Sequence, residues 1–173
     1  MSEVPGDRDE LVDVVDEFDR VVDVVPRRVM RRERLRHRAV FVAVTDSRGR
    51  LLVHRRSNTK DLWPGWFDIA VGGVVTRGED WSTAARRELF EEMGLVAEGL
   101  IALDDERPRG YDDHDVSLLG RTWQVWHDGP VTFVDAEVAE AWWLPRRDIE
   151  SLMTRERFLP DSLALVWPLL RWT

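Results

Sequence analysis

The chain has 173 residues, of which 43% are hydrophobic and 34% charged, a composition typical of a globular domain rather than a disordered segment. The formal net charge of −8 argues against a general nucleic-acid binder, which presents a strongly basic face. The absence of cysteine excludes disulfides, thiolate metal ligands and cysteine nucleophiles, and it fits a cytoplasmic location. No apolar run approaches the roughly 20 residues that cross a bilayer, and the acidic N-terminus does not resemble a secretory signal, so no membrane partner is expected.

The length predicts one domain, residues 1–173, with an N-terminal hairpin and short helix in 1–36 and a core in 37–173. Acidic residues dominate positions 3–23, whereas Pro26–Arg38 carries seven arginines. Two interpretations of this basic segment stay open. It is either an arm that binds phosphate or a solvated helix face that pairs with the acidic segment.

The first predicted elements are a hairpin of two β-branched runs, a short helix and a pair of strands joined by a turn. In chain order these are Leu11–Val15 and Val21–Val25, the helix Arg27–Arg36, and the strands Ala39–Thr45 and Leu51–Arg56 around the turn Asp46–Gly49. A further strand over Phe67–Val75 is expected to be interrupted by its two adjacent glycines, Gly72 and Gly73.

Asp80–Met93 has helical periodicity, with Asp80 as the expected N-cap and Gly94 where a left-handed residue commonly ends a helix. Three strands and two helices are predicted after it: Leu100–Leu103, Leu118–His127, Ala141–Leu144, Arg146–Met153 and Asp161–Trp172. Pro168 should shorten or kink the last helix. The order of elements predicts an α/β fold in which helices pack on a mixed β-sheet.

Glu88, Glu91 and Glu92 are the residues that most strongly suggest chemistry. At positions i, i+3 and i+4 of a helix they share an arc of about 100°. Carboxylates so close repel one another unless a cation lies among them, and oxygen ligands suit Mg²⁺ or Mn²⁺. Taken alone, such a cluster is more often a solvated helix face.

The surrounding pattern resembles the Nudix box at every fixed position. The matching residues are Gly73, Glu79, Arg87, Glu88, Leu89, Glu91, Glu92, Gly94 and Leu95. The resemblance implies a mixed sheet sandwiched between helices and a hydrolase of diphosphate bonds. The implied substrate is a small molecule, a nucleoside diphosphate derivative or a similar organic diphosphate. Nudix enzymes often dimerise, which leaves a homodimer open.

The resemblance also implies roles for individual residues. Glu88 and Glu92 would bind Mg²⁺, or Mn²⁺, assisted by Glu91 and the carbonyl of Gly72. Arg87 and Glu79 would pair and fix the loop before the helix, and Gly73 would let the backbone approach metal or phosphate. A further acid is expected outside the box, and we choose Glu137 over Glu140 in the acidic segment 134–140.

The residues before the box resemble a bacterial group of Nudix hydrolases related to isopentenyl-diphosphate isomerase. That branch implies that Arg56 and Lys60 contact the diphosphate. The isomerase needs a cysteine directly before the box glycine and a histidine directly after it, but Gly72 and Val74 occupy these positions. An isomerase-like enzyme and a non-catalytic nucleotide-binding module remain the alternatives to a hydrolase.

Aromatic and acidic clusters elsewhere give weaker signals. Trp63, Trp66 or Phe67 could stack on a base, although an aromatic beside a strand is more often part of the core. The loop Asp112–Asp115 resembles a metal cluster superficially, and a polar loop is the plainer interpretation. The four histidines show no spacing that indicates a joint site.

Overall fold

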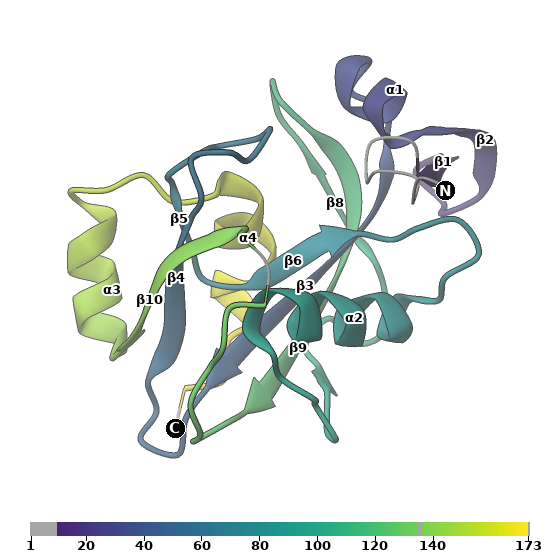
Figure 1. Ribbon diagram of the computed structural model, residues 1–173. Coiled ribbons are helices and arrows are strands. Elements are labelled where there is room, and N and C mark those ends of the chain that lie inside the picture. The colour runs from purple at the N-terminus through teal and green to yellow at the C-terminus, as the bar shows by residue number, and fades with distance from the viewer. Residues whose placement is uncertain (1–9, 135, 173) are drawn as a thin grey trace, which may run out of the picture.

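The computed structural model describes residues 10–134 and 136–172, and Figure 1 shows these as one large mixed sheet with helices on both sides. The outer ends of the expected domain, residues 1–9 and 173, and Asp135 of the acidic segment lie outside this description. The strands are β1 (Leu11–Val15), β2 (Val21–Pro26), β3 (His37–Thr45), β4 (Leu51–Arg56), β5 (Phe67–Asp68), β6 (Val71–Val74), β7 (Ile101–Ala102), β8 (Arg109–Asp112), β9 (Ser117–Trp126) and β10 (Val138–Leu144). The helices are α1 (Arg27–Arg32), α2 (Trp81–Met93), α3 (Arg146–Met153), α4 (Pro160–Leu165) and the 3₁₀ helix η2 (Trp167–Leu169).

Strand β3 is the centre of the sheet. It runs parallel to β9 along its whole length and antiparallel to β6 from Ala39 to Val42. Its residues are apolar almost without interruption, the pattern of a strand covered on both faces. The strand order β10-β4-β3-β1-β2 forms the rest of the sheet, and β7 and β8 pair with β9.

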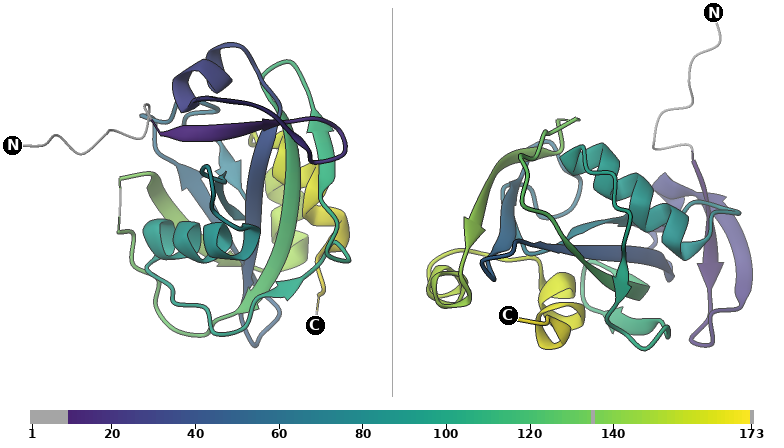
Figure 2. Two further views of the ribbon diagram at one scale, coloured as in Figure 1. Left: turned by 90° about the vertical axis from the view of Figure 1, so that its right-hand side faces the viewer. Right: turned by 90° about the horizontal axis from the view of Figure 1, so that it is seen from below.

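The two faces of β3 belong to two separate cores. Phe41 and its odd-numbered neighbours pack with Ile149 of α3 and Leu165 of α4, whereas Val42 and its even-numbered neighbours pack with Leu89 of α2. Figure 2 shows α2 on one side of the sheet and the C-terminal helices on the other. This alternation follows from the period of two along a strand, and it confirms the predicted α/β sandwich.

Helix α2 has the ends that the sequence predicts. The Asp80 side chain accepts a hydrogen bond of 3.0 Å from the Thr83 backbone N–H, and Gly94 ends the helix with a φ of 64°. Ala84, Leu89 and Met93 are fully buried against the sheet. The buried face therefore fixes the rotation of the helix, and with it the direction of its glutamates.

Near the N-terminus the expected hairpin is present as β1 and β2, and β1 joins the sheet through Val14 opposite His37. The expected helix Arg27–Arg36 is too long, because α1 ends at Arg32. Arg34 then adopts a left-handed conformation with a φ of 51°, which a continuing helix excludes. Strand β4 pairs with β3 through Leu51 opposite Thr45, with β10 along its length, and with β5 through His54 and Arg55.

The strand expected over Phe67–Val75 is broken at a different place from the one predicted. The break lies at Ile69 and Ala70, whose N–H groups both donate to the Asp68 side chain, at 2.7 and 3.2 Å. The two glycines instead lie inside β6. A Cβ atom on Gly72 would lie 2.8 Å from the Val40 carbonyl oxygen, so glycine there permits close pairing with β3.

At the C-terminal end, the expected helix Asp161–Trp172 becomes α4 followed by η2, in agreement with the effect predicted for Pro168. Strand β8 was not predicted, because Arg109–Asp112 is polar and lies at the edge of the sheet beside β9. Within the described ranges, the structure has no helix with the length and apolarity needed to cross a membrane.

Candidate active site

Arg87 holds the loop before α2 against the helix. Its guanidinium makes a two-point contact with the Glu79 carboxylate, at 2.8 and 2.9 Å, and donates to the Val74 carbonyl at 3.1 Å. Glu79 also accepts from the N–H and hydroxyl of Thr76. Burial by itself raises the pKa of Glu79, but its contacts with Arg87 and Thr76 outweigh it and lower the pKa. The pairing is therefore a fixed ionic latch between loop and helix.

Glu88 lies directly against Gly73 of β6. A Cβ atom on residue 73 would lie 2.0 Å from Oε1 of Glu88, so only a glycine leaves room for this carboxylate. Glu88 is 7% exposed and accepts a hydrogen bond of 2.7 Å from Arg87. Its burial raises the pKa to about 7, although Arg87 acts in the opposite direction.

Glu92, one turn further along α2, is 2% exposed. Burial raises its pKa well above the usual range, and the negative charges of Glu88 and Glu137 raise it further. His54 of β4 is equally buried, and its Nε2 lies 3.9 Å from Oε2 of Glu92. Burial lowers the pKa of His54 to about 3, so the imidazole is neutral at physiological pH.

Glu91 differs from its two neighbours. Its side chain is 48% exposed, and Oε2 lies 3.1 Å from Arg87. Across the described ranges, no three acidic or histidine side chains converge closely enough to form a ready metal cage. The box therefore presents two buried carboxylates, from Glu88 and Glu92, with a third at the surface.

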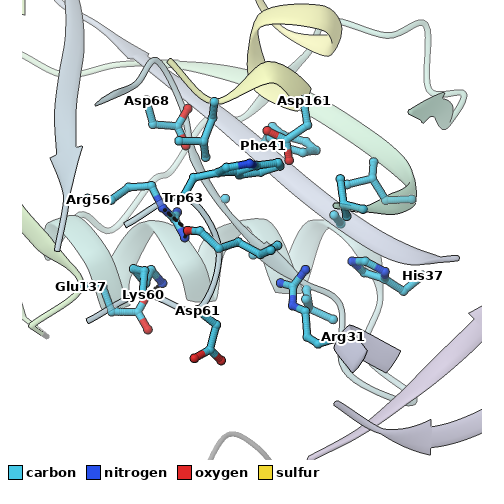
Figure 3. Close-up of a pocket in the computed structure, with 18 of the residues that line it drawn as sticks. Arg31, His37, Phe41, Arg56, Lys60, Asp61, Trp63, Asp68, Glu137 and Asp161 are labelled. Atoms are coloured by element: carbon cyan, nitrogen blue, oxygen red, sulfur yellow. Dashed lines mark hydrogen bonds and ion pairs between the residues drawn. The ribbon is translucent and has the colours of Figure 1, made fainter. Parts of the chain in front are cut away.

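A cavity of about 560 Å³ has Gly72 and Gly73 in its wall, and Gly73 is the glycine against which Glu88 lies. Figure 3 shows Arg56, Lys60 and Glu137 gathered on one side of the Trp63 indole. Lys60 and Glu137 form a direct ion pair, and Arg56 donates to the Leu62 carbonyl at 3.1 and 3.3 Å. Burial by itself raises the pKa of Glu137, but the contact with Lys60 outweighs it and lowers the pKa.

The other acid weighed from the sequence, Glu140, lies within β10. Glu140 is 55% exposed and pairs with Arg55 at 3.2 Å. Of the two acids weighed from the sequence, Glu137 is the one that lines the cavity. Its position beside Lys60 brings together two residues that are 77 positions apart in the chain.

The arginines of the segment Pro26–Arg38 fall into two groups, one at the cavity and one paired with acidic residues. Arg27 and Arg31 line the cavity, and burial lowers the pKa of Arg31 to about 10. Arg36 and Arg38 instead pair with acids of the surface, and the partners of Arg38 are Asp13 and Asp19 in the acidic segment.

The aromatic residues also separate into two groups. Trp63 lines the cavity, is 8% exposed and stacks on Trp66 with ring centres 6.3 Å apart. Phe67 stacks on Phe158 and Trp142 and belongs to the core. The acidic run at 112–115 is polar, and the Asp113 carboxylate accepts from the N–H groups of Asp115 and Val116 and from the Tyr111 hydroxyl.

Sequence reasoning missed three buried residues of this region. His54 lacks any local motif, because only the pairing of sheet and helix brings it to Glu92. Asp68 and Asp161 line the far part of the cavity, and they belong to β5 and α4. An acid in the first turn of a helix, such as Asp161, is typical of a helix start, and an acid at the end of a strand, such as Asp68, is typical of a turn. Neither residue therefore indicated a site in the sequence.

Comparisons with known proteins agree on the family. The NUDIX domain model matches residues 35–164. An uncharacterized Nudix hydrolase of Streptomyces coelicolor is 39% identical over 99% of this chain and 94% of its own length. The uncharacterized Nudix hydrolase YfcD of Escherichia coli K12 is 35% identical over 89% of this chain and 83% of its own length. The crystal structure of DR0079 from Deinococcus radiodurans is 28% identical, with a TM-score of 0.76 over 94% of this chain and 100% of that one.

A more distant solved structure shows the fold alone. The NUDIX domain of Shewanella oneidensis NrtR, complexed with ADP ribose, is 16% identical, with a TM-score of 0.62 over 76% of this chain and 84% of that one.

Proposed function

Because this chain belongs to the Nudix family of diphosphate-cleaving hydrolases, we propose that it hydrolyses a nucleoside diphosphate derivative or a similar organic diphosphate with the help of Mg²⁺, or of Mn²⁺ in its place. The observation that carries the proposal is that the buried Glu88 carboxylate lies against Gly73, which lines a cavity whose wall also holds Arg56 and Lys60.

The donors of the box suit a hard divalent cation. Glu88 and Glu92 are both more than nine-tenths buried, and burial raises both pKa values, so ionising them without a cation is unfavourable. Carboxylate and carbonyl oxygens are the ligands that Mg²⁺ prefers. We assign the metal to Glu88 and Glu92, with Glu91 and the Gly72 carbonyl as further ligands. When bound, the metal supplies charge neutralisation at the phosphate oxygens and a more acidic water.

The other residues of the box hold this arrangement in place. The latch between Arg87 and Glu79 fixes the loop, and Gly73 leaves space for the Glu88 carboxylate. Arg87 also contacts Glu91, so one guanidinium orients three glutamates. We place Glu137 at the site as the acid outside the box. Its carboxylate, kept ionised by Lys60, is an acceptor for a proton from water.

Arg56 and Lys60 would neutralise the diphosphate of the substrate. Both cations line the cavity, and Arg56 is already oriented by the Leu62 carbonyl. A fixed pair of cations beside the metal stabilises the charge of phosphate oxygens without reorganisation. Their positions support our assignment of the chain to the branch related to isopentenyl-diphosphate isomerase.

Isomerisation itself is not proposed. Gly72 and Val74 stand where that reaction needs a cysteine and a histidine, and they offer no group that can move a proton. Deuterium from heavy water should not enter the allylic carbon of isopentenyl diphosphate above the level without enzyme. Incorporation above that level would contradict this part of the proposal.

The function is tested by incubating the protein and Mg²⁺ with a panel of nucleoside diphosphate derivatives and identifying products by mass spectrometry. We expect one phosphorylated product from each side of the cleaved bond, and one atom of ¹⁸O from labelled water in one of them. Glu92→Gln should slow the formation of both products by about 100-fold or more. If no member of the panel is cleaved, or Glu92→Gln cleaves it at a near-normal rate, the proposed function or its site is wrong.

A further inference from the structure

Two buried carboxylates face the cavity away from the box. Asp68 is 3% exposed and Asp161 is 6% exposed, yet both line the cavity wall. Figure 3 shows them on one side of the Trp63 indole, with Arg56, Lys60 and Glu137 on the other side. The cavity therefore has one region that contains Arg56 and Lys60, and an acidic region on the other side of the Trp63 indole.

Ser162 joins the two carboxylates and leaves one oxygen of each for the cavity. Its hydroxyl donates to Oδ1 of Asp68 at 2.6 Å, and its N–H donates to Oδ1 of Asp161 at 2.8 Å. The N–H groups of Ile69 and Ala70 also donate to Oδ1 of Asp68. Across the described ranges, no hydrogen bond from the protein reaches Oδ2 of either aspartate.

Within the part of the chain that the structure describes, no arginine or lysine forms an ion pair with Asp68 or Asp161. Arg56 and Arg31 are near enough to influence Asp161, but neither forms an ion pair with it among the described residues. Neither Oδ2 is among the fully enclosed side-chain atoms of the described residues that lack a partner, so each stays open to the cavity, where a ligand can reach it. When both aspartates are ionised, that ligand must donate hydrogen bonds, because both open atoms are then carboxylate oxygens.

We propose that Asp68 and Asp161 form a specificity subsite that binds the exocyclic amino group of a nucleobase stacked on Trp63. This inference rests on the proposed function, since it names the part of the substrate that lies beyond the diphosphate. An amino group carries two N–H donors, one for each Oδ2. An indole offers a flat surface on which any base stacks, so the carboxylates supply the discrimination.

A base with a carbonyl oxygen at the same position fits poorly. Above pH 7, where both aspartates are ionised, its lone pairs would face the oxygens of both, and one carboxylate would have to take up a proton to accept it. A site that accepts hydrogen bonds from an N–H donor rejects an analogue without that donor, because the polar groups of the site are then left unpaired. Cytosine against uracil, and adenine against hypoxanthine, are the matched pairs that differ in this one group.

The experiment compares CDP-glucose with UDP-glucose, and ADP-ribose with its hypoxanthine counterpart, at saturating Mg²⁺ and at about pH 8.5, where both aspartates are ionised. The amino form should have the larger kcat/KM in at least one pair, by about 10- to 100-fold, the scale of one specific base contact. Asp161→Asn places an amide donor opposite the amino group and should reduce this ratio at least tenfold, mainly through KM. Asp148→Asn removes the same charge from the exposed face of α3 and should keep the wild-type ratio.

Direct binding separates this inference from the proposed function. Isothermal titration with CMP and UMP, and with AMP and IMP, measures base preference without hydrolysis. If the diphosphates are not cleaved but an amino-bearing nucleotide binds more tightly, the proposed function fails and the subsite stands. If the diphosphates are cleaved but amino and carbonyl forms bind and react equally, the subsite is wrong. Asp68→Asn is the second variant, and an unchanged preference in both variants also overturns the inference.

Discussion

Gly73 and the Glu88 carboxylate occupy the same small volume, because a Cβ atom on residue 73 would lie 2.0 Å from Oε1 and 2.5 Å from Oε2 of Glu88. Gly73→Ala must therefore displace a buried carboxylate that Arg87 also holds. We expect a loss of about 1–3 kcal/mol in the free energy of unfolding, the scale of overpacking, and at least a tenfold loss of kcat. Chemical denaturation and turnover on a cleaved substrate measure both effects.

Gly99→Ala is the matched control for that substitution, since a Cβ atom on Gly99 would meet no atom within 4 Å. It should leave turnover unchanged and alter stability by less than about 0.5 kcal/mol. A Gly73→Ala variant as active and as stable as this control would show that Glu88 is not confined as described.

Glu92→Gln and Leu89→Ala should separate chemistry from packing on one helix. Glu92→Gln keeps the shape of the side chain and removes its charge, so turnover should fall by the equivalent of about 3–5 kcal/mol. Burial disfavours the charged form of Glu92, so this variant should be at least as stable as the wild type without metal. Leu89 is fully buried, and its truncation should cost about 2–5 kcal/mol of stability with weaker effects on turnover in the folded fraction. The reverse pattern would contradict the assignment of Glu92.

Mg²⁺ or Mn²⁺ should raise the melting temperature, because a ligand of the folded state stabilises it by about 2.7 kcal/mol at 100 times its dissociation constant. The shift should disappear in Glu92→Gln and persist in Glu150→Gln, whose side chain is exposed on α3. Differential scanning calorimetry at several metal concentrations measures it. An equal shift in both variants would mean that the metal binds outside the box.

Asp161 should make the protein less stable as pH rises. Burial, and then the charge of Asp68, raise its pKa from the ordinary 3.8 to about 7. Below pH 3.8 both states hold the proton. Between these two values the folded state keeps a proton that the unfolded state has lost, so the free energy of unfolding falls until the pH passes about 7.

Asp161→Asn removes this dependence and keeps an acceptor for the Ser162 N–H. The variant should be more stable than the wild type at pH 8 by up to about 4 kcal/mol, at 1.36 kcal/mol per pKa unit. The two should converge near pH 4. Urea denaturation at both pH values tests this, and a constant difference would exclude Asp161 as the source.

The local parts of the site could be predicted because their causes are local. Asp80 and Gly94 cap α2 through contacts within a few residues, and Arg87 reaches Glu79 across eight positions. The parts of the site that depend on long-range contacts could not be predicted from the sequence. His54 of β4 meets Glu92 only after α2 has packed on the sheet, and no spacing in the sequence encodes that meeting.

The misplaced break between β5 and β6 has a similar cause. The glycines at 72 and 73 suggested an interruption, since glycine in a strand often marks one. The Asp68 carboxylate instead turns the chain by accepting from two successive N–H groups, and it does so while hydrogen-bonded to Ser162, 94 positions further on. A residue that acts on its neighbours and on a distant helix at once has no periodic signature.

The link from Ser162 to Asp68 can form only late in synthesis, because Ser162 follows Asp68 by 94 positions. The ribosome makes the box and its latch well before α4, so the carboxylates of the box are made before one wall of the cavity. That wall appears only when Asp161 and Ser162 reach Asp68. A chain stopped just before Pro160 would keep every residue of the box but would lose both the bridge between the two aspartates and the end of the cavity that they form.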